Sequence, residues 1–415
     1  MKNPSRRKWY APLLIALGAA LLLISFAAIA LLVWLRPAAQ DWQQSLRLGP
    51  ITLDVGIEKL IRLGSRHEVA ALLDGRSLRT STGIWRISAT QEASELICER
   101  CQLTLPAIGP APLRLERVSL TFARSHSGYS GSLRLRAEQR EIAVPWTAAV
   151  NSRGADIDIR GAALPMADVV AVLGHDLPEV RIARVTGLLS LQMHLHLPHR
   201  QVEAQWTAAG FHVAGLGTER LLNAALPERC GGSSQRPISG WLPLAVIAAE
   251  DQTFRSHPGY DARQISAALH RNSQQDALHG ASTLTQQLAR LLYTGDERSA
   301  QRKLRELLYA VEMEQTLGKG RILQLYLALA PWGQDVCGAE KAARRYLGKS
   351  AGAVTPAEAA WLASLLTNPD AQLQRVRTSG IDMGRTTRIV QAMRHISTKR
   401  RERAVAEIAS LRPAA

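Results

Sequence analysis

Two kinds of hydrophobic periodicity divide the chain. From about residue 51 to 226, apolar and polar residues alternate over short runs that Gly, Pro, Asn and Ser interrupt, for example at 118–122 and 189–197. A period of two residues is typical of strands, so we expect an antiparallel sheet with one buried face. Short helices are expected within this region, near 56–63 and 165–174.

The second half of the chain follows a helical period. Residues 227–240 are rich in Pro, Gly and Ser, which indicates a domain boundary. Apolar stripes at helical spacing then predict an α-helical globular domain over 235–372, followed by a basic, helical and solvated tail at 373–415. The stripes are Leu284, Leu288, Leu291 and Leu292, then Leu304, Leu307, Leu308 and Val311, then Ile322, Leu325, Tyr326 and Leu329.

Residues 12–35 are almost wholly apolar and are long enough to cross a bilayer, which needs about 20 residues. Three basic residues at positions 6–8 precede them, so the positive-inside rule keeps the N-terminus in the cytoplasm. We therefore expect residues 1–36 to form a cytoplasmic stub and a transmembrane anchor, with a short linker at 37–50. A cleaved signal peptide is the alternative.

The formal net charge of +16 suits a nucleic acid, an anionic lipid or an anionic substrate as partner. No zinc-finger, RNA-binding or helix-turn-helix pattern is present, so the apolar segment favours lipid or substrate over nucleic acid.

Neither the cysteines nor the histidines predict a metal site. Cys98 and Cys101 form a single CxxC with no partner pair, which indicates a local disulfide or two free thiols more than zinc. His194 and His196 share one strand face, where a solvated surface is favoured over a metal site.

Glu250 ends the apolar helical run LAVIAAE and is a candidate general base. Apolar neighbours desolvate a carboxylate and raise its pKa, which suits a group that accepts a proton. A helix cap or a surface charge is the alternative. Supporting roles are expected nearby for Asp251 as a hydrogen-bond acceptor, Phe254 as a loop anchor, His257 in a polar network and Gly259 at positive φ.

Two further segments suit an anionic ligand. Residues 280–287 (GASTLTQQ) open a helix with hydroxyls and free backbone N–H groups, an arrangement that binds phosphates, although an ordinary capped helix fits equally. Arg302, Lys303 and Glu306 lie on the helix face opposite the second leucine stripe. Alone they make a surface ion pair; beside a cleft they make a cationic clamp for a diphosphate.

Together these segments resemble the family-51 peptidoglycan glycosyltransferases, from about residue 243 to 370. The resemblance rests on EDQTFRSHPG, GASTLTQQLAR, ERSAQRKLRE, KGRILQLYLALAPWG, GAEKAARRYLGKS and TPAEAAWLASLLTNP. It implies a lysozyme-like α-helical fold and polymerisation of lipid II into glycan chains. The fold class is therefore α+β, with a transmembrane helix, a β-rich middle domain and a helical glycosyltransferase domain.

The resemblance also implies roles for individual residues. Glu250 matches the glutamate that deprotonates the acceptor hydroxyl, and Glu306 matches the one that assists departure of the diphosphate or ligates a divalent cation, Mg²⁺ or Mn²⁺. Lys319 and Tyr326 match the motif that packs behind the site. The substrate contacts would be Ser282, Thr283, Gln287, Arg290, Arg302 and Lys303.

Three positions depart from the family pattern. Leu291 and Ala328 replace asparagines and Leu347 replaces an aromatic residue. These changes keep open a scaffold that binds lipid II or a partner through a degenerate domain. A glycan-cleaving enzyme is a third hypothesis, which the cationic clamp opposes.

The expected setting is the inner membrane, in a single-pass arrangement with a periplasmic catalytic domain. The expected partners are lipid II, the growing glycan and cell-wall synthesis or division proteins, with no nucleic acid. For 51–226 the sequence leaves three roles open: docking a partner, binding lipid or acting as a spacer.

Overall fold

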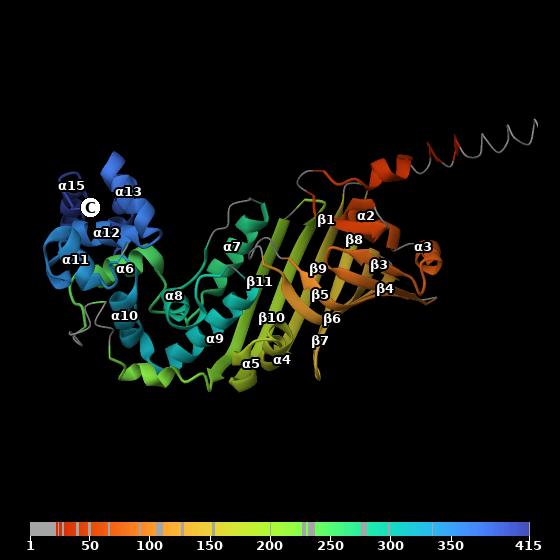
Figure 1. The fold of residues 1–415 in the computed structure, drawn as a ribbon, viewed down its shortest axis with the longest axis horizontal. Helices are drawn as coiled ribbons and strands as arrows, with labels where there is room; N and C mark the ends of the chain where they lie inside the picture. Colours follow the sequence, from red (N-terminus) through yellow and green to blue (C-terminus); the bar gives the residue numbers. More distant parts are fainter. Residues whose placement is uncertain are drawn as a thin grey trace, which may run out of the picture.

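The protein consists of a large β-sheet and a helical domain that lie side by side (Figure 1). A computed structural model gives this fold and describes residues 22, 23, 25, 26, 29–38, 41–48, 51–64, 67–90, 93–104, 111–125, 128–151, 154–199, 201–225, 230, 237–274, 280–297, 299–333 and 335–414. Helices α7 (Ala262–Gln274) and α9 (Ala300–Thr316) lie along one edge of the sheet, between it and the rest of the helical domain.

An eleven-stranded sheet of order β11-β10-β9-β8-β7-β6-β5-β4-β3-β1-β2 accounts for most of the first half of the chain. Every pairing is antiparallel, as the alternating pattern predicts. The strands are β1 Gln43–Leu48, β2 Ile51–Gly56, β3 Ser77–Thr80, β4 Gly83–Ala89, β5 Ala93–Leu103, β6 Leu113–Ser125, β7 Gly128–Ala137, β8 Arg140–Val150, β9 Ala155–Pro165, β10 Arg184–Leu197 and β11 Gln201–Ala214.

The strand register separates an apolar face of the sheet from a polar one. One row of paired residues across β8 to β11 is apolar, and the adjacent row on the other face is polar. The apolar row is Trp146, Ile159, Met193 and Ala204; the polar row is Thr147, Asp158, His194 and Glu203. The prediction of one apolar face is therefore confirmed.

Short helices cover part of this sheet; the first and third of them lie at the predicted places, near 56–63 and 165–174, and the other two were not predicted. They are α2 (Ile57–Gly64), α3 (His67–Leu72), α4 (Met166–Leu173) and α5 (Pro178–Ile182). In α4, Val169 and Val172 pack on Ile142 in a small buried cluster. On the polar face, His194 pairs with Asp158 and His196 with Asp156, each at 2.5 Å. These half-exposed pairs agree with the solvated interpretation of that face.

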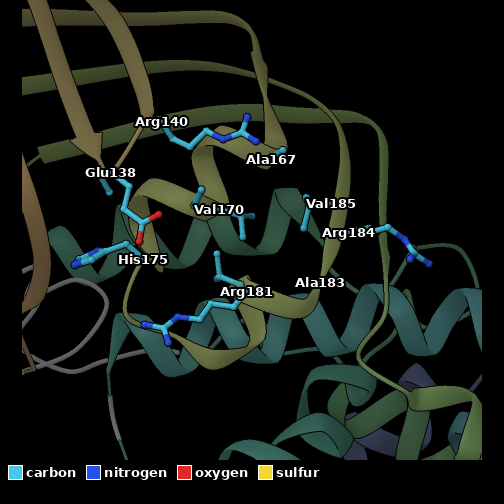
Figure 2. Close-up of a pocket in the computed structure, with 12 residues that line it drawn as sticks. Glu138, Arg140, Ala167, Val170, His175, Arg181, Ala183, Arg184 and Val185 are labelled. Atoms are coloured by element: carbon cyan, nitrogen blue, oxygen red, sulfur yellow. The ribbon is translucent and has the colours of Figure 1, made fainter.

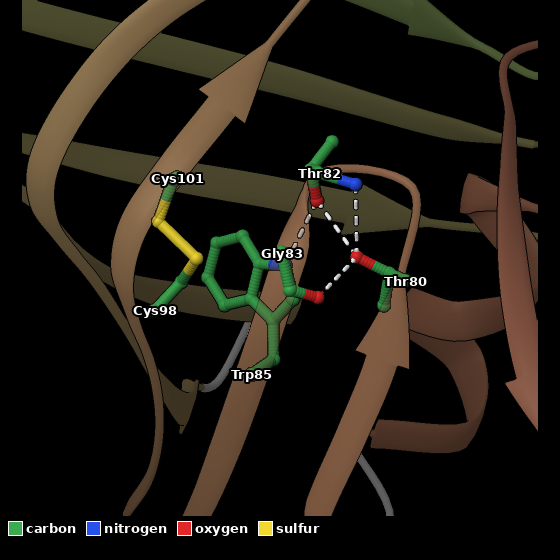
Figure 3. Close-up of a disulfide and its surroundings, with 6 residues drawn as sticks. All are labelled: Thr80, Thr82, Gly83, Trp85, Cys98 and Cys101. Atoms are coloured by element: carbon green, nitrogen blue, oxygen red, sulfur yellow. Dashed lines mark hydrogen bonds between the residues drawn. A yellow bond between two sulfur atoms is a disulfide. The ribbon is translucent and has the colours of Figure 1, made fainter.

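A disulfide joins Cys98 to Cys101 within β5 (Figure 3). Both sulfurs are buried against the apolar face, although residues three apart in a regular strand face opposite ways. Arg100 between them has a φ of 54°, which turns the chain so that both side chains point inward. Gly83 has φ 139°, and a Cβ there would lie 2.9 Å from the sulfur of Cys98, so the disulfide requires glycine at this position.

A cavity of about 420 Å³ lies between the β7–β8 turn, α4 and α5 (Figure 2). Arg181 and Arg184 on its rim extend in opposite directions, and Arg140 pairs with Asp168 at 2.7 Å. The cationic side chains therefore do not converge on one point. One flank of α5 faces the cavity, whereas Glu179 on the same helix faces α9.

The helical domain is built around one buried cluster that extends from Leu242 to Leu411. Its elements are α6 Leu242–Glu250, α7 Ala262–Gln274, α8 Leu284–Ala289, a π-helical turn η3 Arg290–Thr294, α9 Ala300–Thr316, α10 Gly318–Leu329, α11 Ala339–Leu347, η4 Ala351–Ala353, α12 Pro356–Leu365, α13 Pro369–Ser379, α14 Met383–Ala392 and α15 Thr398–Ile408. The 3₁₀ helix η1 (Thr218–Leu222) connects it to β11.

Several predicted boundaries are wrong. Residues 373–415 are not a solvated tail, because Ile389, Val390 and Ile408 are buried in the domain core. The many basic residues of α15 led to the prediction of a solvated helix, although Ala404 and Ile408 on the same helix are buried. Residues 37–50 are not only a linker, since β1 lies within them. Leu291 is 36% exposed and does not belong to the first buried stripe.

Most of the predicted anchor at 12–35 lies outside the described residues. Residues 29–35 are helical, and apolar side chains on the described part are exposed, among them Leu22, Phe26 and Val33. No helix among the described residues combines the length and apolarity that crossing a bilayer requires.

A second disulfide joins Cys230 to Cys337 across 107 residues and closes most of the helical domain into a loop. Because stabilisation by a cross-link grows with the loop it closes, we expect Cys230→Ala/Cys337→Ala to lower the free energy of unfolding by about 2–4 kcal/mol. Urea unfolding measures this change. Cys98→Ala/Cys101→Ala is the matched control, because its sequence separation is 3 and the loop effect is small. An equal loss in both variants would contradict the expectation.

Candidate active site

Glu250 lies at the C-terminal end of α6. Helix α6 is apolar around most of its circumference, and Leu242, Ala245 and Val246 are fully buried. The carboxylate of Glu250 accepts a hydrogen bond of 3.1 Å from Gln287 Nε2 and lies 3.5 Å from Arg385 Nη2. Burial raises the pKa of Glu250, and the bond from Gln287 and the charge of Arg385 only partly oppose this.

A chain of hydrogen bonds orients Gln287 toward Glu250. Tyr326 on α10 donates from its hydroxyl to Gln287 Oε1 at 2.8 Å, so the amide nitrogen of Gln287 points at Glu250. Burial, together with the nearby charge of Glu250, raises the pKa of Tyr326 well above 10.0. The tyrosine therefore stays protonated and remains a donor. This gives Tyr326 the supporting position that the resemblance implies.

Asp251 fixes the loop that follows α6 and also the start of α8. Its Oδ2 accepts from the backbone N–H of Leu284 at 2.9 Å and contacts His257 Nε2 at 2.8 Å. Gly259 donates its N–H to His257 Nδ1, and Lys319 donates to the carbonyl of His257 at 2.6 Å. The polar network expected around His257 is thus present in the structure.

Two more supporting residues lie where they were predicted. Phe254 is completely buried, with the Lys319 ammonium 4.6 Å from its ring centroid. Gly259 has a φ of 96°, and a Cβ there would lie 2.8 Å from the carbonyl oxygen of Ala310. Both the backbone conformation and the close helix contact therefore require glycine.

Thr283 caps α8, and its hydroxyl is bonded within the protein. Its hydroxyl accepts from the N–H of Gln286 at 3.2 Å and donates to the carbonyl of Gly259 at 2.7 Å. The side chain of Gln286 completes a capping box. The structure does not support the predicted substrate contact by Thr283, because this residue is buried and its hydroxyl already bonds to Gly259 and Gln286.

The second glutamate lies on α9 between two cations. Ser299 caps this helix, and about two turns later Glu306 is only 1% exposed. Its Oε1 accepts from Arg302, and its Oε2 accepts from Lys303 Nζ at 2.7 Å. Lys303 also donates to the hydroxyl of Ser282 at 2.6 Å, which links α9 to the start of α8. The ion pairs expected from the sequence are therefore present, and they lie at a buried position and not on an open surface.

Burial lowers the pKa of Lys303, while the charge of Glu306 opposes the effect. Because both oxygens of Glu306 are bound by cations, this carboxylate does not fit the role of a divalent-metal ligand. Among the described residues no group of three or more His, Cys, Asp or Glu side chains is placed to hold a metal ion.

The charge of Arg290 acts on Glu250 and also on Lys303, the partner of Glu306. It belongs to the π-helical turn η3 that continues α8. Its charge lowers the pKa of Glu250 and also that of Lys303, so it acts on both sides of the site. Its side chain is 41% exposed, and its contact to Asp296 is long, at 3.8 Å. A cation that is half exposed and weakly paired is available to an anionic ligand.

Sequence reasoning missed two residues. Arg385 on α14 contacts Glu250 but lies in the segment that was assigned to the tail. Glu314 accepts from Thr285 at 2.6 Å and from Lys319 at 2.7 Å, which joins α8, α9 and α10. The apolar positions of α14, at Ile389 and Val390, were the available signal for placing Arg385 in the domain.

Comparison with known proteins gives a consistent picture. A family profile described as Transglycosylase matches residues 231–394. A biosynthetic peptidoglycan transglycosylase of Nitrosomonas eutropha is 44% identical over 164 residues, which are 39% of this chain and 67% of that protein. The chain belongs to the family-51 peptidoglycan transglycosylases. Another relative of that name, from Aeromonas hydrophila, is 47% identical over 132 residues, which are 32% of this chain and 56% of that protein.

The transglycosylase match encloses both glutamates, the cations around them and Arg385. Its end at residue 394 lies in the segment that had been assigned to the tail, in agreement with the packing of α14. The sheet at 43–214 lies outside it.

Proposed function

We propose that the helical domain polymerises lipid II by transferring a glycan from a lipid diphosphate to an acceptor sugar. The observation that carries the proposal is a pair of glutamates in different environments, with the charge of Arg290 acting both on Glu250 and on Lys303 beside Glu306. Glu250 has a raised pKa, and Glu306 is held between Arg302 and Lys303. Membership of the transglycosylase family and the names of the relatives support the same chemistry.

In this proposal Glu250 accepts the proton of the attacking hydroxyl. A carboxylate whose pKa is raised by burial is a stronger base than one in water, and it ionises closer to neutral pH. As the proton moves to Glu250, the acceptor oxygen bonds to the anomeric carbon of the donor and the bond to the lipid diphosphate breaks. Attack from the face opposite the leaving group inverts the anomeric configuration.

The cations act on the departing diphosphate. Negative charge grows on its bridging oxygen during the transfer, so fixed positive groups lower the barrier. Arg290, Arg302 and Lys303 supply that charge, and Ser282 holds the ammonium of Lys303 in place. In this arrangement Glu306 keeps two cations together at a buried position, and its role is to orient them.

The proposed setting is the outer face of the inner membrane. The apolar segment at 12–35, the exposed apolar side chains of its described part and the two disulfides support an anchored protein in an oxidising compartment. Lipid II and the growing glycan are the proposed partners, together with cell-wall synthesis or division proteins that dock on the sheet.

The test is incubation of the full-length protein with lipid II. We expect glycan polymer resistant to organic extraction, with one lipid diphosphate released for each glycosidic bond formed. Absence of polymer, with lipid II recovered intact under conditions that support a known transglycosylase, would refute the proposal. Release of soluble fragments from finished cell wall would instead favour hydrolysis.

Arg385 should tune the pH dependence of the reaction. Its positive charge lowers the pKa of Glu250, so Arg385→Gln should raise that pKa further. A base must be deprotonated, and activity is lost as pH falls through its pKa; the acidic limb of kcat/KM against pH should therefore move to higher pH. Arg388→Gln on the exposed face of α14 is the control and should leave the limb unchanged. A limb that moves to lower pH, or not at all, would contradict this role.

A further inference from the structure

Helix α9 is shared between the transglycosylase domain and the sheet domain. One face carries Arg302, Lys303 and Glu306 of the candidate site. The opposite face is buried against the sheet domain, where Leu308 and Val311 are 0% and 1% exposed. They belong to one cluster with Met166, Val170, Phe211, Val213 and Tyr260. The sheet domain therefore supplies part of the packing that places the candidate clamp.

One ion pair crosses this boundary directly beside Glu306. Glu179 of α5 is 3% exposed and lies outside the family match. Its Oε1 accepts from Arg305 Nε at 2.7 Å and lies 2.6 Å from Arg305 Nη2. Arg305 precedes Glu306 in the chain, so a shift of its backbone is passed directly to the second glutamate.

The same ion pair also supports the turn that carries Arg290. Arg305 donates to the carbonyl of Tyr293 in η3 at 3.4 Å. The ring of Tyr293 stacks on that of Tyr309, with centroids 4.1 Å apart, and Tyr309 in turn donates to Glu179 at 3.5 Å. Burial and the charge of Glu179 raise the pKa of Tyr309 to about 12, so it remains a donor.

We propose that Glu179 is a positioning residue for glycan transfer. By holding Arg305 and Tyr309, it fixes α9 and η3 relative to each other, and with them Glu306 and Arg290. The inference rests on the proposed function and adds a residue from outside the transglycosylase domain. It also means that the sheet domain is not a detachable spacer, because its removal would expose the apolar face of α9.

Two other carboxylates also contact α9 or the connection to the sheet, but neither holds α9 against η3. Glu312 accepts from the backbone N–H groups of Leu216 and Thr218, two turns beyond Glu306, and holds the connection from the sheet. Asp176 accepts from the side chain of Gln301 at 2.8 and 2.9 Å, near the start of α9, but that pair is exposed. Of these three carboxylates, Glu179 contacts the residue beside Glu306 and, through Arg305, also η3.

The experiment compares full-length Glu179→Gln, Glu179→Asp and Asp176→Asn in steady-state polymerisation of lipid II. Displacing fixed charges harms the transition state more than substrate binding, so Glu179→Gln should lower kcat about ten-fold and change KM less than about three-fold. Glu179→Asp keeps the charge and should recover most of kcat. Asp176→Asn removes a carboxylate at the same boundary and should behave as wild type.

Hydrogen exchange of the same proteins measures the local opening of α9 and η3 without depending on activity. Amides of α9 and η3 should exchange faster in Glu179→Gln, while those of α12 stay unchanged. The inference would be overturned if Glu179→Gln changed neither kcat nor the exchange rates. It would also be overturned if Asp176→Asn lost as much kcat, or if the loss of kcat in Glu179→Gln equalled the fraction of protein that is unfolded. If the wild type makes no polymer, the proposed function fails, and the exchange result alone decides whether Glu179 holds α9 and η3.

Discussion

Glu250→Gln should abolish glycan polymerisation while leaving the fold intact. Gln cannot accept the proton of the acceptor hydroxyl, and loss of a positioned base costs about 10²–10⁴ in rate. The amide keeps the shape of the side chain and its place at the end of α6, between Gln287 and Arg385. The measurement is the initial rate of polymer formation from lipid II, with binding of lipid II followed in parallel.

The stability of this variant gives an independent check. A carboxyl whose pKa is raised in the folded state binds more protons folded than unfolded, so its contribution to stability is lost as pH rises from its unfolded to its folded pKa. At neutral pH, Glu250→Gln removes that unfavourable charge and should unfold at a temperature no lower than wild type. A variant that polymerises at the wild-type rate, or one that fails to fold, would contradict the role given to Glu250.

Glu306→Gln should reduce both activity and stability. The carboxylate balances Arg302, whose side chain is 10% exposed, and loss of one partner from a buried ion pair costs about 3 kcal/mol. The uncompensated cations should also lose their fixed positions, lowering kcat by about 10²-fold. Urea unfolding and the polymerisation rate, measured on the same preparation, check the two effects.

The matched control is another glutamate–arginine pair with the same spacing along a helix. Glu340 and Arg344 on α11 are 35% and 67% exposed, and such a pair contributes less than about 1 kcal/mol. Glu340→Gln should therefore leave polymerisation unchanged. If Glu306→Gln were as stable as Glu340→Gln, the buried clamp would not be what holds Arg302 and Lys303.

Much of the fold follows from local pattern in the sequence. Alternation at 189–197 predicts β10 because each side chain of a strand faces the opposite side from its neighbour. The stripe that contains Leu308 predicts burial of one face of α9. It does not reveal that the burying partner is the sheet domain, since periodicity gives the direction of a side chain and not what it meets.

The candidate site was predictable to the same extent. Glu250 and Glu306 stand in local patterns whose chemistry is visible in the sequence, namely an apolar run before one and two cations before the other. Arg385 and Glu250 are 135 residues apart in the chain and Glu179 and Arg305 are 126 apart, so only the tertiary fold brings each pair together. Thr283 shows the reverse error, because a hydroxyl at a helix start serves a cap as readily as a ligand.

The two hydrogen bonds from the backbone N–H groups of Leu216 and Thr218 to Glu312 restrict the relative movement of the sheet domain and the helical domain. A hinge at this connection would have to break two hydrogen bonds to a buried carboxylate and open the apolar contact around Tyr260. Rigid-body swinging of one half against the other is therefore disfavoured. We therefore expect any movement that admits a long polymer to involve segments within the helical half, while the connection to the eleven-stranded sheet stays closed.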